Sequence, residues 1–275
     1  MLHPRRAVIS VAIVLAALFA LPANAAATSY PKSMASTGDS ITRAYNDCVL
    51  PYVDCPSASW STGTSTSVNS HYLRLRALNP AITGHNFNDA ASGARMADLS
   101  GQMSKAVSQR VQYVTVLMGA NDACTSSIDS MTTVTTFQAQ FTAAMDTVTS
   151  GAPRARIFVA SIPNVYHLWE IFKNNLLART VWSLFGVCQS LLADPLSTDP
   201  DDVARRQAFY DRILAYNQVL ADVCAQYQHC LFDGNAVFAA EFTTSDVTSR
   251  DYFHPSVSGQ AKLAAATWAA SYWGS

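Results

Sequence analysis

The segment 113–122, which reads YVTVLMGAND, carries the pattern that decides the fold. Its first six residues form a short apolar run that ends at Gly119, as is typical of a strand buried in a parallel sheet. A polar motif follows at once. In open parallel sheets, sites lie outside the carboxyl ends of the strands. The segment therefore predicts a buried strand that delivers Asn121 and Asp122 to such a site.

Two further polar motifs follow predicted strands in the same way. Residues 30–37 are expected to form a strand that runs into Gly38-Asp39-Ser40-Ile41. Residues 82–88 are expected to form another, which ends in the motif NDAASG at 88–93. Later strands are predicted at 155–162 and 230–232, and helices at 71–78, 96–111, 133–149, 203–228 and 257–273. Strands alternating with helices predict an α/β domain with a parallel sheet.

Two stretches interrupt this alternation. Residues 46–67 are rich in Ser, Thr, Pro and Cys and are expected to form a loop closed by a disulfide. Residues 163–200 are rich in aromatic side chains, for which we expect a mixture of packing roles and contacts with an acyl group (Tyr166, Trp169, Phe172, Trp182 and Phe185).

Composition limits the class of protein. The chain has 275 residues, 49% of them hydrophobic, which is enough for one large domain or two small ones. Neither an internal repeat nor a linker is evident, so a single domain over 26–275 is expected. A net charge of -1 gives no basic footprint for nucleic acid.

The first 25 residues are typical of a secretory signal peptide. Two arginines at 5–6 precede an apolar run over 7–21, and Ala23-Asn24-Ala25 provides a small-residue cleavage site. An uncleaved membrane anchor is the alternative, but the run is short for a bilayer span. We therefore expect a secreted protein that begins near Ala26 and keeps no membrane insertion.

Six cysteines follow the signal segment, and an even number in an exported protein indicates disulfides. They allow 15 connectivities. Cys48–Cys55 and Cys224–Cys230 can each close a small loop at low entropic cost, which leaves Cys124–Cys188. Sequential pairing is favoured, although the sequence does not fix it. No C-x-x-C or H-E-x-x-H motif suggests a metal site.

A nucleophile and a base stand at opposite ends of the mature chain. Ser40 follows the first strand, and Asp251-Tyr252-Phe253-His254-Pro255 lies near the end. An activated serine needs a base within hydrogen-bond reach and a third group to orient that base. Ser40 could cap a helix, a role compatible with that of a nucleophile. His254 could be a satisfied buried histidine, and Asp251 could be a surface turn residue.

Four blocks in order give the chain its resemblance to a family. Ser40, Gly93, Asn121 and His254 match the four letters of the SGNH hydrolases, also called GDSL lipases or esterases. Ile41 stands where the GDSL name has leucine, a conservative apolar change. The blocks span residues 38 to 255. The six cysteines and the segment 162–170 look most like the secreted actinomycete-type branch.

This resemblance implies a flavodoxin-like, three-layer αβα fold with a central five-stranded parallel sheet. It implies Ser40 as nucleophile, His254 as base and Asp251 as the orienting acid. The oxyanion hole would use the N–H groups of Ser40 and Gly93 and the side-chain amide of Asn121. Structural roles are expected for Asp39 and Asp122, and packing or surface roles for the other mature-chain histidines (His71, His85, His167 and His229).

The expected activity is hydrolysis of carboxylic esters through an acyl-enzyme, without a metal or other cofactor, by a monomer acting on a small-molecule or lipid ester. Lipase, simple esterase and phospholipase all stay open. One alternative is a carbohydrate esterase or acyltransferase on the same scaffold. Another is a secreted binding module that has lost the chemistry. No G-x-S-x-G motif, phosphate loop or nucleotide fingerprint points to another class.

Overall fold

The computed structural model describes Met1 and residues 30–274, and within these residues five parallel strands form one sheet. The strands are β1 Met34–Gly38, β2 Asn86–Asn88, β3 Tyr113–Leu117, β4 Arg156–Val159 and β5 Cys230–Phe232. Their order is β2-β1-β3-β4-β5, the flavodoxin order. The predicted signal peptide, residues 1–25, and its cleavage site lie outside the described residues.

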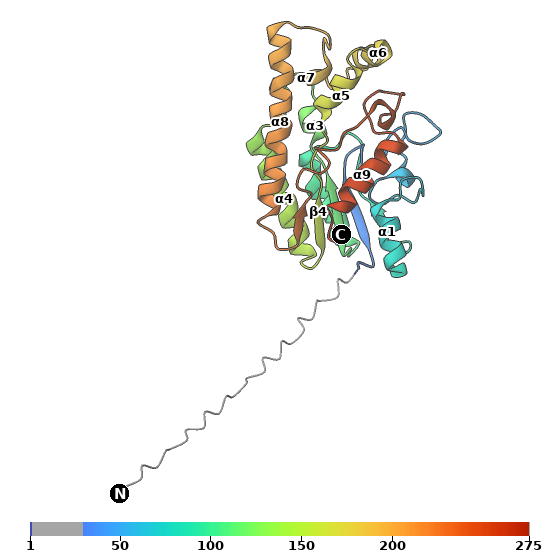
Figure 1. Ribbon diagram of the computed structural model, residues 1–275, viewed down its shortest axis with the longest axis vertical. Coiled ribbons are helices and arrows are strands. Elements are labelled where there is room, and N and C mark those ends of the chain that lie inside the picture. Colours follow the sequence, from blue (N-terminus) through green and yellow to red (C-terminus); the bar gives the residue numbers. More distant parts are fainter. Residues whose placement is uncertain (2–29, 275) are drawn as a thin grey trace.

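Helices cover both faces of the sheet (Figure 1). One face carries α1 His71–Leu78 and α9 Val257–Ala269, which meet through the rings of His71 and Trp268, 5.3 Å apart. The other carries α2 Leu99–Ser108, α4 Val134–Gly151 and α8 Pro200–Cys224, which pack side by side. The predicted three-layer αβα architecture is confirmed.

The aromatic-rich stretch 163–200 folds into short helices at the carboxyl end of the sheet (Figure 1). These are α5 Val165–Phe172, α6 Leu176–Leu184 and α7 Gln189–Leu192, close to α3 Ala120–Ala123. Three of its large rings take packing roles, because Trp169, Phe172 and Trp182 are buried in the core, whereas Phe185 is exposed. The side chains that α5 contributes to a pocket beside Ser40 are aliphatic instead: Val165 and Leu168.

Some element boundaries differ from the sequence-based expectation because local caps and prolines override the apolar pattern. The first strand begins at Met34, four residues late, and the second is shortened because Pro80–Ile82 forms a 3₁₀ turn. Helix α2 begins at Leu99, after a 3₁₀ turn over Met96–Asp98. The carboxylate of Asp98 accepts the Arg95 N–H at 2.8 Å and closes that turn.

The core is centred on β3, every residue of which is buried. The polar side chain of β3 that enters it is paired, because the buried Thr115 hydroxyl lies 2.6 Å from that of Ser61. The ring of His71 lies between the hydroxyls of Tyr113 and Thr267, at 3.0 and 2.9 Å. Burial lowers the pKa of His71 to about 3, so this histidine stays neutral and serves packing.

Three disulfides join the six cysteines within residues 30–274: Cys48–Cys55, Cys124–Cys188 and Cys224–Cys230. The first closes a loop after β1, at the carboxyl end of the sheet. The third joins the end of α8 to the first residue of β5, at the amino end. In the described part of the chain, no helix has the length and apolar character needed to cross a bilayer.

Candidate active site

The end of β1 places Ser40 at the carboxyl edge of the sheet. Gly38 there has a φ of 142°, and a Cβ at this position would lie 2.3 Å from the carbonyl oxygen of Leu117, so only glycine fits. The side-chain amide of Gln102 forms two hydrogen bonds with Gly38. It accepts the Gly38 N–H at 2.7 Å and donates to the Gly38 carbonyl at 2.9 Å. Consecutive turns, not a helix, follow Ser40, so the helix-cap alternative is wrong.

A continuous hydrogen-bonded chain joins Ser40 to the far end of the sequence. The Oγ atom of Ser40 lies 2.8 Å from Nε2 of His254. Nδ1 of the same ring lies 2.8 Å from Oδ2 of Asp251. The Ser40 side chain is largely buried, with 8% of its residue surface exposed. The structure therefore brings three of the predicted site residues into contact across 214 positions of sequence.

The charge state of Asp251 fixes the tautomer of His254. Burial raises the pKa of this carboxyl, but the hydrogen bond and charge of His254 and two backbone N–H groups outweigh it. The pKa of Asp251 is therefore lowered and the group is ionised, so it can only accept. Nδ1 of His254 must donate to it, which leaves Nε2 free to accept the Ser40 hydroxyl.

The loop that carries His254 is held on several sides. Oδ1 of Asp251 accepts the N–H groups of Phe253 and His254 at 2.9 and 3.0 Å. The His254 carbonyl accepts the N–H of Thr248 at 2.9 Å. The buried indole of Trp182 on α6 donates to the carbonyl of Tyr252 at 3.1 Å. Asp251 and His254 thus lie in a short turn whose backbone is fixed by packing and hydrogen bonds.

Asn121 and Gly93, the other predicted oxyanion residues, follow β3 and β2, the two strands that flank β1. Asn121 lines the same pocket as Ser40 and His254, and its Nδ2 donates to the carbonyl of Ala94 at 3.0 Å. Gly93 lies in the turn 91–94 with a φ of 81°, a left-handed conformation that suits glycine. This exposed turn borders an adjacent hollow. Asn121 and the Gly93 turn are therefore linked through Ala94.

The pocket over Ser40 is small and mostly apolar. Its volume is about 50 Å³. Besides Ser40, Asn121 and His254, hydrophobic side chains from four separate segments form most of its wall: Ile41, Val165, Leu168, Phe242, Val247 and Phe253. An uncharged group with an apolar chain is the kind of ligand that such a lining accepts.

Two buried carboxyl groups lie beneath the site. Asp39 accepts the N–H of Ile41 at 2.9 Å through Oδ1, while Oδ2 has no partner among the described residues. Complete burial raises its pKa to about 7, against the opposing effects of the Ile41 N–H and of His254. Asp122 accepts the N–H of Met96 and the hydroxyl of Thr132, both at 2.8 Å, and so ties two loops together.

Sequence reasoning missed one polar residue at the site, Asn46. Its Nδ2 donates to Oδ2 of Asp251 at 2.5 Å, and 205 positions of sequence separate the two residues. A lone asparagine in a Ser- and Cys-rich loop gives no signal of such a partner. In the part of the chain that the structure describes, no group of three or more His, Cys, Asp or Glu side chains is placed to hold a metal ion.

Comparisons with known proteins bear on the family and the fold of the chain. The sequence profile of the GDSL-like lipase/acylhydrolase family matches residues 37–262. A structure from Parabacteroides merdae described as a GDSL-like lipase has a TM-score of 0.51 at 14% identity, covering 86% of this chain and 94% of that one. That likeness supports the fold.

Two more solved structures are similar at lower scores. A family 3 carbohydrate esterase from Clostridium thermocellum has a TM-score of 0.49 at 12% identity, with 86% of this chain and 92% of that chain covered. Phospholipase A1 from Streptomyces albidoflavus NA297 has a TM-score of 0.47 at 19% identity, with 83% and 94% covered. A search of curated proteins gives no match.

Proposed function

The chain belongs to the GDSL-like lipase/acylhydrolase family, and from that premise we propose that it is a secreted serine esterase that cleaves carboxylic esters through an acyl-enzyme on Ser40. The observation that carries the proposal is the chain of two 2.8 Å contacts that runs from Ser40 through His254 to Asp251. Nucleophile, base and orienting acid need that arrangement.

In the acylation step, Oγ of Ser40 attacks the ester carbonyl while Nε2 of His254 takes the hydroxyl proton. Asp251 orients the ring and stabilises the imidazolium that forms. His254 then gives the proton to the alcohol oxygen as the carbon–oxygen bond breaks. A water molecule, deprotonated by the same nitrogen, releases the acid and restores Ser40.

The developing oxyanion needs fixed donors during both steps. We assign these to the N–H groups of Ser40 and Gly93 and to the amide of Asn121. One hydrogen of the Asn121 amide is used on Ala94, which leaves the second for the substrate oxygen. The bond to Ala94 also restricts the rotation of that amide, so the donor is oriented before the substrate arrives.

The apolar lining of the pocket favours an acyl group without charge. We propose that the acyl chain contacts Val165 and Leu168 of α5 and the ring of Phe253, and that the alcohol faces solvent. A panel of p-nitrophenyl esters with increasing acyl length, phospholipids, triglycerides and acetylated polysaccharide identifies the substrate class. Activity on acetylated polysaccharide alone would assign the chain to the carbohydrate esterases instead.

The test of the reaction compares the protein that begins at Ala26 with its Ser40→Ala variant on p-nitrophenyl esters. We expect turnover by the first and none above background by the second. Equal rates would rule the mechanism out. The wild-type rate should also fall toward acid pH, because His254 must be neutral to act as a base.

Export is part of the same proposal. The features that support it are the positively charged and apolar segments of 1–25 and the pairing of all six cysteines. N-terminal sequencing of protein recovered from culture medium should begin near Ala26. Recovery of the uncleaved chain from membranes would favour an anchor instead.

A further inference from the structure

The side chain of Asn46 is fixed at both ends beside the catalytic acid. Its Nδ2 donates at 2.5 Å to Oδ2 of Asp251, the same oxygen that accepts Nδ1 of His254. Its Oδ1 accepts the N–H of Tyr52, also at 2.5 Å. Asn46 is 2% exposed. The amide is therefore held in one orientation and directed at the oxygen that orients the base.

The backbone at Asn46 suits this role. Its φ of 73° is left-handed, a conformation that asparagine tolerates better than most residues. Its own N–H donates to the carbonyl of Val53 at 3.0 Å. Residues 46–55, which we call the brace loop, thus fold back on themselves and aim the Asn46 amide outward at the acid.

The residue before Asp251 also forms hydrogen bonds with the brace loop. Arg250, which immediately precedes Asp251, donates through Nη1 to the carbonyls of Asn46 and Cys48, both at 2.6 Å. Its Nη2 donates to the carbonyl of Val49 at 3.1 Å. Two segments 200 positions apart are therefore joined in both directions, by an amide from one side and a guanidinium from the other.

The brace loop also touches the oxyanion side of the site. Asp54 pairs with Nε of Arg43 at 2.9 Å and accepts the hydroxyl of Ser92 at 2.5 Å. Ser92 is the neighbour of Gly93. The disulfide Cys48–Cys55 closes the part of the brace loop that contains Asp54, and Asn46 lies two residues before Cys48. The brace loop therefore contacts the acid through Asn46 and the oxyanion turn through Asp54.

We propose that Asn46 is a positioning residue for Asp251 and that the disulfide-closed brace loop holds it in place; this rests on the proposed esterase function. A carboxylate rotates easily about its last bond, whose rotamers are broad. Two backbone N–H groups on Oδ1 and the Asn46 amide on Oδ2 remove that freedom. Asp251 then keeps one oxygen aligned with His254 throughout the cycle.

The first test compares Asn46→Gly with Asn235→Gly. Asn235 is an exposed asparagine whose φ is 68°, so both changes replace a left-handed asparagine by the residue that best tolerates that backbone. We expect Asn46→Gly to lower kcat about 10- to 100-fold with KM nearly unchanged, because a small misalignment of catalytic groups is costly. Asn235→Gly should keep wild-type kinetics.

The second test uses Asn46→Asp, which keeps the shape of the side chain but places a second carboxylate beside Asp251. Added negative charge favours the protonated ring of His254. The acidic limb of the kcat/KM profile should therefore move to higher pH. Asp39, Asp47 and Arg250, which also act electrostatically near this pair, are unchanged, so the displacement reports the new carboxylate. An unmoved limb would mean that the side chain at position 46 does not face the Asp251–His254 pair.

The third test compares two disulfides of similar span, 7 and 6 residues. We expect Cys48→Ser/Cys55→Ser to lower kcat several-fold, and Cys224→Ser/Cys230→Ser to leave it unchanged. Rates are normalised to the fraction of serine labelled by a fluorophosphonate, so that unfolded protein is not counted.

Wild-type kcat in Asn46→Gly, or an unmoved acidic limb in Asn46→Asp, would overturn the positioning role while leaving the esterase proposal intact. Equal kcat in the two disulfide variants would overturn the role of the loop. A wild-type protein that hydrolyses no ester would remove both proposals together, and Ser40→Ala distinguishes that outcome from the others.

Discussion

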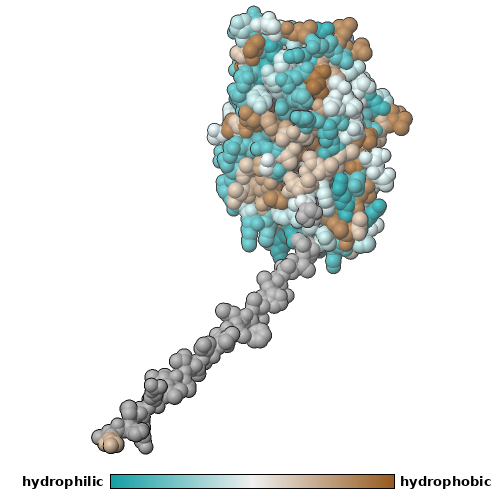
Figure 2. Space-filling model, viewed as in Figure 1, coloured by the Kyte–Doolittle hydropathy of each residue, from teal (hydrophilic) through white to brown (hydrophobic). Residues whose placement is uncertain are grey.

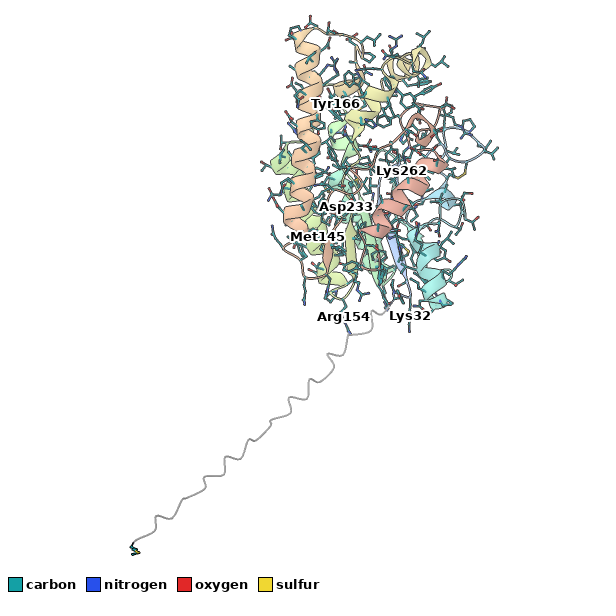
Figure 3. The ribbon with its side chains drawn as sticks, in the orientation of Figure 1. Lys32, Met145, Arg154, Tyr166, Asp233 and Lys262 are labelled. Atoms are coloured by element: carbon teal, nitrogen blue, oxygen red, sulfur yellow. A yellow bond between two sulfur atoms is a disulfide. The ribbon has the colours of Figure 1, made fainter. Side chains whose placement is uncertain are left out.

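The two ends of the parallel sheet differ in chemistry more than in shape. At the carboxyl end, Ser40, Asn121 and His254 surround a pocket of about 50 Å³. At the amino end, residues that precede the strands, such as Pro31, Gln112 and His229, line a hollow of about 800 Å³. Arg154 and Lys32 mark that amino end in Figure 3, and Tyr166 lies toward the other.

The larger hollow holds no contact like that between Ser40 and His254 among the described residues. The candidate site therefore lies where strand direction predicts it and not at the larger cavity. Parallel strands bring each following loop to the same edge, so groups remote in sequence meet there. At the amino edge lie the loops that run from the end of a helix into the next strand. These loops contribute mainly packing and surface charge.

The surface differs between the ends as well. Figure 2 shows hydrophobic side chains on the end of the molecule that carries α6 and on the projecting loop beside it. The exposed residues there are Val49, Leu50, Tyr52, Leu176, Leu177, Leu184 and Phe185. The apolar surface is thus concentrated at the end that carries the site.

The sharpest test of this comparison replaces one group at each edge. Ser40→Ala should lower kcat/KM about 10⁴- to 10⁶-fold, because it removes the nucleophile. His229→Ala, at the amino edge, should leave ester hydrolysis within twofold of wild type. Steady-state kinetics on a p-nitrophenyl ester measures both. Loss of activity in the His229 variant alone would reverse the comparison.

Removal of the charge on Asp251 should have the next largest effect. Asp251→Asn keeps the size of the side chain but can present an amide donor to Nδ1 of His254, which favours the wrong tautomer. We expect kcat to fall by about 10⁴-fold. A discontinuous assay at high enzyme concentration and saturating substrate can measure so low a kcat. A loss below tenfold would mean that His254 is oriented by other groups.

Loss of an oxyanion donor should be smaller. Asn121→Ala removes one amide from the carboxyl edge, and we expect kcat to fall about 10²- to 10³-fold, or roughly 2.7–4 kcal/mol in the barrier. Gln112→Ala removes an amide of similar kind from the amino edge and should not change kcat. If both variants kept wild-type kcat, the oxyanion would have to be stabilised by backbone groups alone.

The last prediction concerns stability, because no effect on the rate is asked of Asp39. Because the folded pKa of Asp39 is raised from 3.8 to about 7, the folded state binds more protons than the unfolded state between those values. Wild-type stability should therefore fall as pH rises through this window.

Asp39→Asn keeps the acceptor for the Ile41 N–H but cannot ionise, so its stability relative to wild type should rise from about pH 4 to 7. The gain is at most about 4 kcal/mol. Urea unfolding at several pH values measures it. Asp211→Asn, a change at an exposed residue of α8, is the control. The difference in its unfolding free energy from wild type should not change with pH. A difference for Asp39→Asn that does not change with pH would contradict the raised pKa of Asp39.

Local sequence pattern predicted much of this fold, because several elements are determined by near neighbours. The apolar run at 113–118 forms β3, and the helix expected at 71–78 is α1, which is capped by Ser70. The pattern at 163–200 did not reveal α5 to α7, since three short helices separated by Asn and Gly leave no long period to detect.

Contacts between segments far apart in the sequence were the other feature that could not be predicted in full. Motif order suggested that Ser40, Asp251 and His254 belong together, and the structure places them in contact. The bonds of Asn46 and Arg250 join segments about 200 positions apart without any motif. Such pairs depend on how loops are laid over the sheet edge, which neither periodicity nor turn chemistry encodes.

Labelling with a fluorophosphonate probe, followed by mass spectrometry of the peptides, tests the central claim most directly. The account predicts one modified residue, Ser40, and loss of labelling in His254→Ala, because the hydroxyl needs that base. Labelling at another serine, or labelling of Ser40 that does not depend on His254, would contradict it.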